Sequence, residues 1–180
     1  LQPSLLIDTS TLFKSKEDVA SMTAPYMTED RIFGHRGSFR MEDFLDTGKV
    51  NLCREQIKGE TGLILIYGHG AAEVCSNPDL LIYADMARWE IQMRSRRKEI
   101  NGLGVDNKDD APSIHYKRGY FIDWNVCDQL KKRLLPIADY WLDTHQPETP
   151  KLISGDTLRQ GLIKTAHQPF RVVPFFDPAP

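Results

Sequence analysis

The chain has 180 residues, of which 41% are hydrophobic and 27% are charged, so its length and composition are those of one ordinary globular domain with a sizeable core. A formal net charge of −2 gives no reason to expect a nucleic acid or an anionic membrane as partner, and no apolar run approaches the length that spans a bilayer. The three cysteines, Cys53, Cys75 and Cys127, lack any C-x-x-C spacing and favour reduced thiols in a cytoplasmic protein over disulfides or a zinc site.

Apolar runs rich in β-forming residues predict a series of strands along the chain. Most of these runs are nearly continuous rather than alternating, which is typical of strands buried on both faces of a parallel sheet. The predicted strands cover residues 4–9, 63–67, 79–85, 119–123, 139–144 and 170–176.

Helical patterns lie between the predicted strands, and the first of them begins at Ser15, a plausible N-cap. Because strands that alternate with helices require right-handed crossovers, the pattern predicts a single three-layer α/β domain, with a mainly parallel sheet and helices on both faces. Residues 101–119 form a long irregular segment rich in glycine and charge, which is typical of a lid or another functional loop. The predicted helices cover residues 15–27, 41–46, 49–59, 85–102, 125–138 and 154–166.

Three of the predicted strands end in an aspartate, at Asp8, Asp85 and Asp143. Ligands of open α/β sheets bind at the carboxyl ends of the strands. These carboxylates could therefore ring a site for a metal–phosphate complex, with Asp8 or Asp85 as a metal ligand or base. The alternative is that each acid caps a helix or lies in an ordinary loop, and the residues alone leave both interpretations open.

The motif YGHGAAE follows the predicted strand at residues 63–67. Gly68 and Gly70 would let backbone amides approach an anion, and His69 between them could donate a hydrogen bond to it. A tight turn is the alternative. The motif differs from the G-x-x-x-x-G-K-[ST] loop of P-loop NTPases, and the 180 residues contain no match to that pattern.

A group of arginines lies near the end of the predicted helix 85–102. Arg94, Arg96 and Arg97 directly precede the glycine-rich segment, and arginine side chains bind phosphate oxygens in a bidentate fashion. Cations near a helix C-terminus also stabilise the helix dipole, which is the simpler explanation. The rest of this helix is expected to pack on the sheet through apolar residues at helical spacing: Met86, Trp89, Met93 and Ile100.

Two other chemistries have no support in the sequence. The five histidines show no H-x-H or H-x-x-x-H spacing, so no zinc site is expected in this chain. The sequence contains no G-x-S-x-G motif, and no cysteine has an evident histidine partner, so nucleophilic hydrolysis is not expected.

The order of the segments GHRGSFRMEDFLD, GLILIYGHGAA and DLLIYADMARWEIQMRSRRKE resembles the second half of a uridine kinase or phosphoribulokinase-like domain, over about residues 33–118. The resemblance implies a P-loop-kinase-like fold in which Asp85 ends a strand, Arg94, Arg96 and Arg97 contact phosphate, and residues 101–118 form a mobile lid. The phosphate-binding loop of that family and its lysine are not found in this sequence.

A second resemblance covers essentially the whole chain. The phrases LIYADMARWEIQ, KRGYFIDW, PKLISGD and PFRVVPFFDPAP resemble the N-terminal region of the long mannose-6-phosphate isomerase-like proteins of gut Bacteroidetes and related bacteria. This implies that residues 1–180 are part of a longer chain, with a strand and turn before Leu1 and a cupin isomerase domain after Pro180. It also implies that zinc belongs to that cupin domain, so no cofactor is expected in residues 1–180 apart from a Mg–nucleotide complex.

From these features we expect an accessory domain without an isomerase centre of its own. It would bind a small phosphorylated metabolite, either a sugar phosphate or a nucleotide, and would be covalently linked to the cupin domain. Nucleic acids and membranes are not expected as partners. Two alternatives stay open: an active phosphotransferase whose phosphate loop precedes Leu1, and a structural or oligomerisation module without a ligand.

Overall fold

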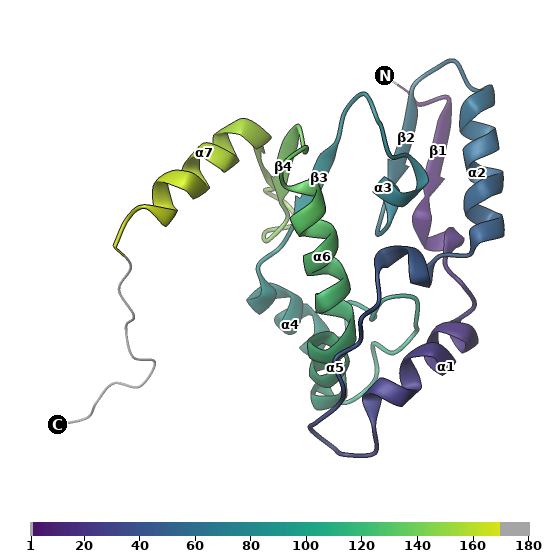
Figure 1. Ribbon diagram of the computed structural model, residues 1–180, viewed down its shortest axis with the longest axis vertical. Helices are drawn as coiled ribbons and strands as arrows, with labels where there is room; N and C mark the ends of the chain where they lie inside the picture. The colour runs from purple at the N-terminus through teal and green to yellow at the C-terminus, as the bar shows by residue number, and fades with distance from the viewer. Residues whose placement is uncertain (1, 170–180) are drawn as a thin grey trace.

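The computed structural model describes residues 2–169, and Figure 1 shows how its elements are arranged. The first part contains β1 (Leu5–Asp8), the 3-10 helix η1 (Thr9–Leu12), α1 (Lys16–Met27), the 3-10 helix η2 (Met41–Phe44), α2 (Thr47–Gly59), β2 (Ile64–Tyr67) and α3 (Ala71–Val74). The second part contains β3 (Ile82–Asp85), α4 (Arg88–Arg96), α5 (Pro112–Arg118), the π-helix η3 (Gly119–Asp123), α6 (Trp124–Leu134), β4 (Tyr140–Asp143), β5 (Lys151–Ser154) and α7 (Gly155–Ala166). None of the helices in these described residues is long and apolar enough to cross a membrane.

Side-chain caps fix where two of the early helices begin. At the start of α1, Ser15 Oγ accepts a hydrogen bond from the amide of Asp18 at 3.0 Å, which confirms the predicted cap. At the start of α2, Asp46 Oδ1 accepts a hydrogen bond from the amide of Lys49 at 2.9 Å. Such caps satisfy amides that the first turn of a helix leaves without a partner, so the local sequence determines both starting points.

The strands form two sheets. β1 pairs in parallel with β2, with Leu5 opposite Ile64 and Asp8 opposite Tyr67. β3 pairs in parallel with β4, and β5 pairs antiparallel with the other edge of β4. The predicted α/β class is confirmed, whereas one continuous sheet between two helix layers is not formed by residues 2–169.

The core consists of two apolar clusters. The first lies between the β1–β2 sheet and α2, which runs alongside β1 in Figure 1. Its buried members are Ile7, Leu12, Leu45, Val50, Cys53 and Val74. The second brings α1, η2, η3 and α6 together through the buried residues Val19, Met41, Phe44, Leu103, Ile122 and Val126. η2 contributes Met41 and Phe44 to the second cluster, and Leu45, the next residue, belongs to the first cluster. This short segment therefore connects the two parts of the core.

Two predictions about the middle of the chain were wrong. Residues 119–123, predicted as a strand, form the π-helix η3, because they continue the helical backbone of α5 into α6. The apolar run there is the buried side of a helix, as the full burial of Ile122 shows. Residues 101–119, predicted as an irregular loop, contain α5 in their second half, and Pro112 stands in its first turn, where proline is favoured.

Several predicted boundaries also differ. The helix predicted at residues 85–102 is limited to α4, because Lys98 adopts a left-handed φ of 59° that stops a right-handed helix. Met86 and Ile100 therefore lie outside it, and Trp89 is 63% exposed, so the predicted apolar face is incomplete. Within the helix predicted at residues 41–46, Met41–Phe44 form a single 3-10 turn. The strand β5 was not predicted. The predicted strand at residues 170–176 lies outside the described residues.

Candidate functional site

A cavity of about 2400 Å³ lies between the two sheets. Its walls include residues 65–67 of β2 and 82–85 of β3, together with the segments that follow these strands, residues 68–72 and 86–88. The carboxyl ends of both strands therefore open onto the same space, which is where ligands of α/β proteins commonly bind. The volume exceeds the roughly 300–1,000 Å³ that is typical of a small-molecule pocket.

Most of the residues predicted to form a site line this cavity. Those that line it are Gly68, His69, Gly70, Asp85, Arg94 and Arg96. Asp143, which ends β4, also lines it, and its Oδ1 accepts a hydrogen bond from the amide of His145 at 2.9 Å. Asp8 and Arg97 are not among the lining residues, so the structure brings most of the predicted residues, but not all of them, to one place.

The loop after β2 is a tight turn fixed by a buried threonine. The hydroxyl of Thr9 donates to the carbonyl oxygens of Tyr67 at 3.0 Å and His69 at 2.8 Å. Gly68 and Gly70 have positive φ angles of 108° and 84°, and a Cβ on Gly68 would lie 2.4 Å from Thr9 Oγ1. The glycines are therefore required by the turn itself, and the turn holds the loop at the cavity wall.

His69 is exposed at the cavity wall, and the protein atoms near it partly desolvate its imidazole. This partial desolvation lowers the pKa of its imidazole. A neutral ring is therefore favoured at neutral pH, and it can offer one N–H donor to a ligand in the cavity.

Asp85 is held at the carboxyl end of β3 by contacts with α6 and β4. Its Oδ2 accepts hydrogen bonds from Lys131 Nζ at 2.5 Å and from Trp141 Nε1 at 3.1 Å. Its backbone oxygen accepts from both the amide and the hydroxyl of Thr144, each at 2.8 Å. The carboxylate is thus oriented and charge-paired, and its side chain is 27% exposed.

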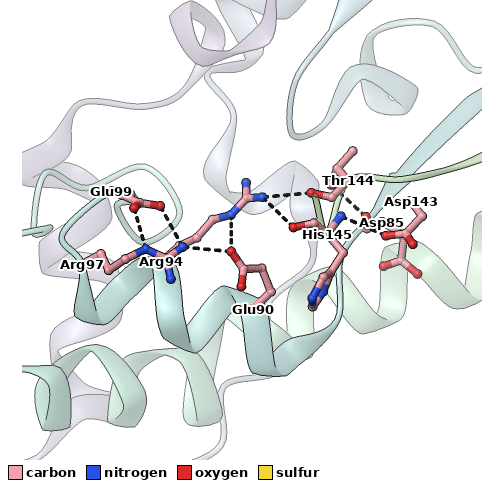
Figure 2. Close-up of polar contacts among 8 residues, drawn as sticks. All are labelled: Asp85, Glu90, Arg94, Arg97, Glu99, Asp143, Thr144 and His145. Carbon is pink, nitrogen blue, oxygen red and sulfur yellow. Dashed lines mark hydrogen bonds and ion pairs between the residues drawn. The ribbon is translucent and has the colours of Figure 1, made fainter. Parts of the chain in front are cut away.

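Figure 2 shows that Arg94 is occupied by protein contacts. Its Nε donates to Glu90 Oε1 at 3.0 Å, and its Nη2 donates to the carbonyl oxygen of Thr144 at 2.9 Å. The side chains of Arg94 and Glu90 are only 17% and 15% exposed. Arg94 therefore joins α4 to the segment after β4, and its charge is already paired with Glu90.

Figure 2 shows Arg97 beside Glu90 and Glu99, and Arg97 is not among the residues that line the cavity. It donates to Glu99 Oε1 at 2.6 Å and to Glu90 Oε1 at 2.9 Å, and these hydrogen bonds raise the pKa of its guanidinium. The hydrogen bonds from Arg94 and then from Arg97 lower the pKa of Glu90. Arg96, in contrast, lines the cavity, is exposed, and makes no ion pair within residues 2–169. Of the three predicted arginines, Arg96 is therefore the one that lines the cavity without an ion-pair partner within residues 2–169.

Asp8 acts as a local cap. Its Oδ1 accepts a hydrogen bond from the amide of Ser10 at 2.9 Å at the start of η1, and this hydrogen bond lowers the pKa of the carboxyl group. The alternative interpretation of a capping acid therefore accounts for its position. No group of three or more His, Cys, Asp or Glu side chains in the described part of the chain is placed to hold a metal ion.

The charged residues that line the cavity are mostly basic. Ten lysines and arginines line it against four aspartates, although the whole chain has a formal net charge of −2. Some of them are paired, such as Arg88 with Asp128 at 2.8 Å. Lys14 and Lys151 line the cavity and form no ion pair within residues 2–169. A cavity with this excess of positive charge favours an anionic ligand.

A buried ionic cluster includes two residues that line the cavity, Asp123 and Leu103. Arg118 Nε is 3.3 Å from Asp123 Oδ2, and both side chains are about nine-tenths buried. Arg118 also donates to the carbonyl oxygen of Leu103 and the hydroxyl of Thr23, each at 3.1 Å. Burial raises the pKa of Asp123 to about 6, even though the charge of Arg118 opposes this shift. The cluster fastens the segment after residue 100 to the start of α6.

This raised pKa predicts a pH dependence of stability. Because the folded-state pKa of Asp123 lies above its ordinary value of 3.8, the folded protein binds a proton more tightly than the unfolded chain, so this residue adds stability as the pH falls. Between pH 7 and pH 5, wild type should gain about 1 kcal/mol relative to Asp123→Asn, which does not titrate. Urea unfolding of both proteins at pH 5, 6 and 7 measures the difference, and a constant difference across the three pH values would contradict the prediction.

Sequence reasoning missed the residues that hold Asp85. Lys131 and Trp141 belong to α6 and β4, far from Asp85 in sequence, and neither stands in a recognisable motif. Cys127, Leu130 and Leu134 are spaced three and four residues apart, so they lie on one face of α6, and Lys131 lies next to that face. This helical spacing was the sequence feature from which the position of Lys131 could have been predicted.

The fold and the cavity define an α/β domain with a large basic cleft at the carboxyl ends of its strands. Residues 1–167 match the family described as "Domain of unknown function (DUF8485)", and the chain belongs to this family. Comparison with curated proteins and with solved structures found no match to either.

Proposed function

We propose that this chain binds a small phosphorylated ligand, a sugar phosphate or a nucleotide, in the cavity between the two sheets. The observation that carries the proposal is the ratio of ten lysines and arginines to four aspartates among the lining residues, at the carboxyl ends of β2 and β3. Phosphate is dianionic near neutral pH, so its binding is favoured by several cations around one space. The resemblance to kinase-like domains agrees with this choice of ligand.

Arg96 and the loop after β2 are the contacts we assign to the phosphate. Arg96 lines the cavity and, among residues 2–169, has no acidic partner, so its guanidinium can donate two hydrogen bonds to phosphate oxygens. Gly68, His69 and Gly70 all line the cavity, so the backbone of this loop can reach a ligand there. Lys14 would add charge from the opposite wall.

Arg96→Ala is expected to weaken binding of the phosphorylated ligand by about tenfold or more, since a hydrogen bond to a charged group contributes about 1.5–3 kcal/mol. Isothermal titration with mannose 6-phosphate and with Mg–ATP measures the effect. Arg97→Ala is the matched control, because Arg97 comes from the same turn but lies off the cavity wall. Equal affinities of wild type and Arg96→Ala for a ligand that binds would overturn the assignment.

The biological context we propose is an accessory domain of a mannose-6-phosphate isomerase-like protein, linked covalently to a cupin domain that carries the zinc. In this proposal residues 1–180 have no isomerase activity. We also propose that the complete protein has a three-layer, P-loop-kinase-like arrangement, for which the parallel pairs β1–β2 and β3–β4 are the support. Sequencing the complete reading frame tests the context, since a cupin domain after residue 180 is required.

An active phosphotransferase is the second candidate, and the position of Asp85 favours it. An acid held at the carboxyl end of a strand, beside a basic cavity, is where a metal–nucleotide complex needs a carboxylate. Incubation of the full-length protein with Mg–ATP and a sugar tests this function, with Asp85→Asn as the control. If no nucleotide or sugar phosphate raises the melting temperature of the protein, the domain is a structural module, because a ligand that binds the folded state must stabilise it.

A further inference from the structure

Two exposed tyrosines line the cavity where α5 continues into η3. Tyr116 is 50% exposed and Tyr120 is 55% exposed, and both are among the lining residues. They stand four residues apart in one continuous helical backbone, so their side chains project from the same side of it. Because aromatic side chains are characteristic of the walls of small-molecule pockets, these two residues are a candidate contact surface for a ligand. We call Tyr116 and Tyr120 the tyrosine pair.

The two rings of the tyrosine pair are held nearly parallel. The angle between their planes is 13°, and their centres are 6.3 Å apart. The ring of Tyr116 packs edge-to-face with that of Trp124 at 5.2 Å between centres, and the ring of Tyr120 packs edge-to-face with that of Phe121 at 5.0 Å. Phe121 in turn packs on the second core cluster. These contacts fix the two rings and leave about half of each exposed, so a flat ring that stacks on one of them lies parallel to both.

The helix α4 brings positive charge close to the tyrosine pair. At its start, the guanidinium of Arg88 lies 4.8 Å from the ring centre of Trp124 and is paired with Asp128 at 2.8 Å. α4 also contacts α5, and Figure 1 shows the two helices next to each other. Arg96, at the other end of α4, lines the same cavity as the tyrosine pair and makes no ion pair within residues 2–169. An unpaired cation and an aromatic surface therefore lie on neighbouring helices around one space.

We infer that the tyrosine pair stacks on the base of a nucleotide whose phosphate is bound at Arg96. Stacking on aromatic side chains is favourable for any nucleobase, because every base has a flat π-face, and the phosphate suits the excess of cations around the cavity. The inference deepens the proposed function by choosing the nucleotide among its two ligand classes. It rests on the proposed function for the phosphate contact, whereas the stacking contact is independent of it.

A sugar phosphate matches the tyrosine pair less well than a nucleotide does. The hydroxyl groups of a sugar ring need polar side chains with free donors and acceptors around them. The charged side chains that reach the Trp124 end of this surface, Arg88 and Asp128, are bonded to each other through both carboxylate oxygens, at 2.9 Å and 2.8 Å. The surface therefore offers aromatic faces more than it offers free polar groups.

Titration calorimetry with adenosine, AMP and mannose 6-phosphate tests the inference. AMP and mannose 6-phosphate each carry one phosphate monoester, so the ratio of their affinities measures the contribution of the base. AMP is expected to bind at least about fivefold more tightly than mannose 6-phosphate, and adenosine is expected to bind without any phosphate. An affinity for AMP no greater than that for mannose 6-phosphate would overturn the inference.

Substitutions in the tyrosine pair test which residues the base contacts. Tyr116→Ala and Tyr120→Ala are each expected to weaken AMP binding by about fivefold or more, whereas Tyr116→Phe and Tyr120→Phe, which keep the rings, should change it by less than about twofold. Tyr116→Leu keeps apolar bulk against Trp124 but has no π-face, so it is expected to show the same loss even where the alanine variant unfolds. Unchanged AMP affinity in the folded alanine and leucine variants would overturn the inference.

Trp89→Ala is the matched control for these variants. Trp89 is 63% exposed on α4 and is not among the residues that line the cavity, so its removal should leave the affinity for AMP unchanged. A loss as large as that of Tyr116→Ala would contradict a specific role of the tyrosine pair.

The same titrations separate the inference from the proposed function. Equal affinities for adenosine and AMP, both reduced by Tyr116→Leu, would support stacking on the tyrosine pair and reject the phosphate contact. Binding of mannose 6-phosphate that is tighter than that of AMP would reject the base contact and support the phosphate contact. Absence of binding by all three compounds would overturn both.

Discussion

Replacement of Phe44 with alanine is expected to lower the free energy of unfolding by about 3–5 kcal/mol. Phe44 is fully buried in the second core cluster, and its ring packs edge-to-face on Phe39 with 5.8 Å between the ring centres. Its carbonyl oxygen also accepts a hydrogen bond from the amide of Lys14 at 3.0 Å, so the residue is fixed in position. Because η2 joins the two parts of the core, the cavity left by the missing ring would weaken contacts of α1 and α6 together.

Phe33→Ala is the matched control for this prediction. Phe33 is 67% exposed, so the same deletion of a ring should change the free energy of unfolding by less than about 1 kcal/mol. Urea unfolding followed by circular dichroism measures both variants. Equal destabilisation of the two would mean that Phe44 does not have the central role that its burial indicates.

Gly155→Ala is expected to be the most damaging small substitution in α7, with a cost of about 1–3 kcal/mol or more. A Cβ at this position would lie 1.9 Å from the carbonyl oxygen of Ala138, which is fully buried. The amide of Gly155 donates to the carbonyl oxygen of Asp139 at 2.7 Å, so the backbone cannot move away without losing that hydrogen bond. The contact fastens the start of α7 to the turn before β4.

Gly161→Ala provides the opposite expectation in the same helix. A Cβ at Gly161 would meet no atom within 4 Å, so alanine is expected to stabilise α7 by about 0.5–1 kcal/mol through its better helix propensity. Amide exchange of residues 155–166 reports on both variants, with faster exchange for Gly155→Ala and slower exchange for Gly161→Ala. A change in the same direction for both would contradict the proposed clash at Ala138.

Local chemistry made part of the fold predictable from the sequence. The cap at Ser15 and the apolar runs at the positions of β1, β2, β3 and β4 depend on neighbouring residues, and the structure confirms them. The pairing of strands depends on residues far apart in the chain, so the division into two sheets could not be derived from the runs themselves. Residues 119–123 show the same limit, because a short apolar run is compatible with either a strand or a buried helix.

The candidate site was predictable in its position more than in its contacts. The rule that ligands bind at the carboxyl ends of strands pointed to Gly68 and Asp85, and both of them line the same cavity as Arg96. The sequence could not show that Glu90 lies between Arg94 and Arg97 and pairs with both. That distinction depends on which side of α4 faces the cavity and on where the helix ends.

The unbroken run of α5, η3 and α6 has a mechanical consequence. It extends from Pro112 to Leu134, about 35 Å at 1.5 Å per residue. Near one end Arg118 holds the carbonyl oxygen of Leu103, and near the other Lys131 holds Asp85. One continuous helical run therefore contacts both Leu103 and Asp85, and it sets the spacing between these two parts of the cavity wall. The π-helix η3 lies between the two contacts, so the wider turn that it introduces sets how the two α-helical parts of this run are oriented about each other.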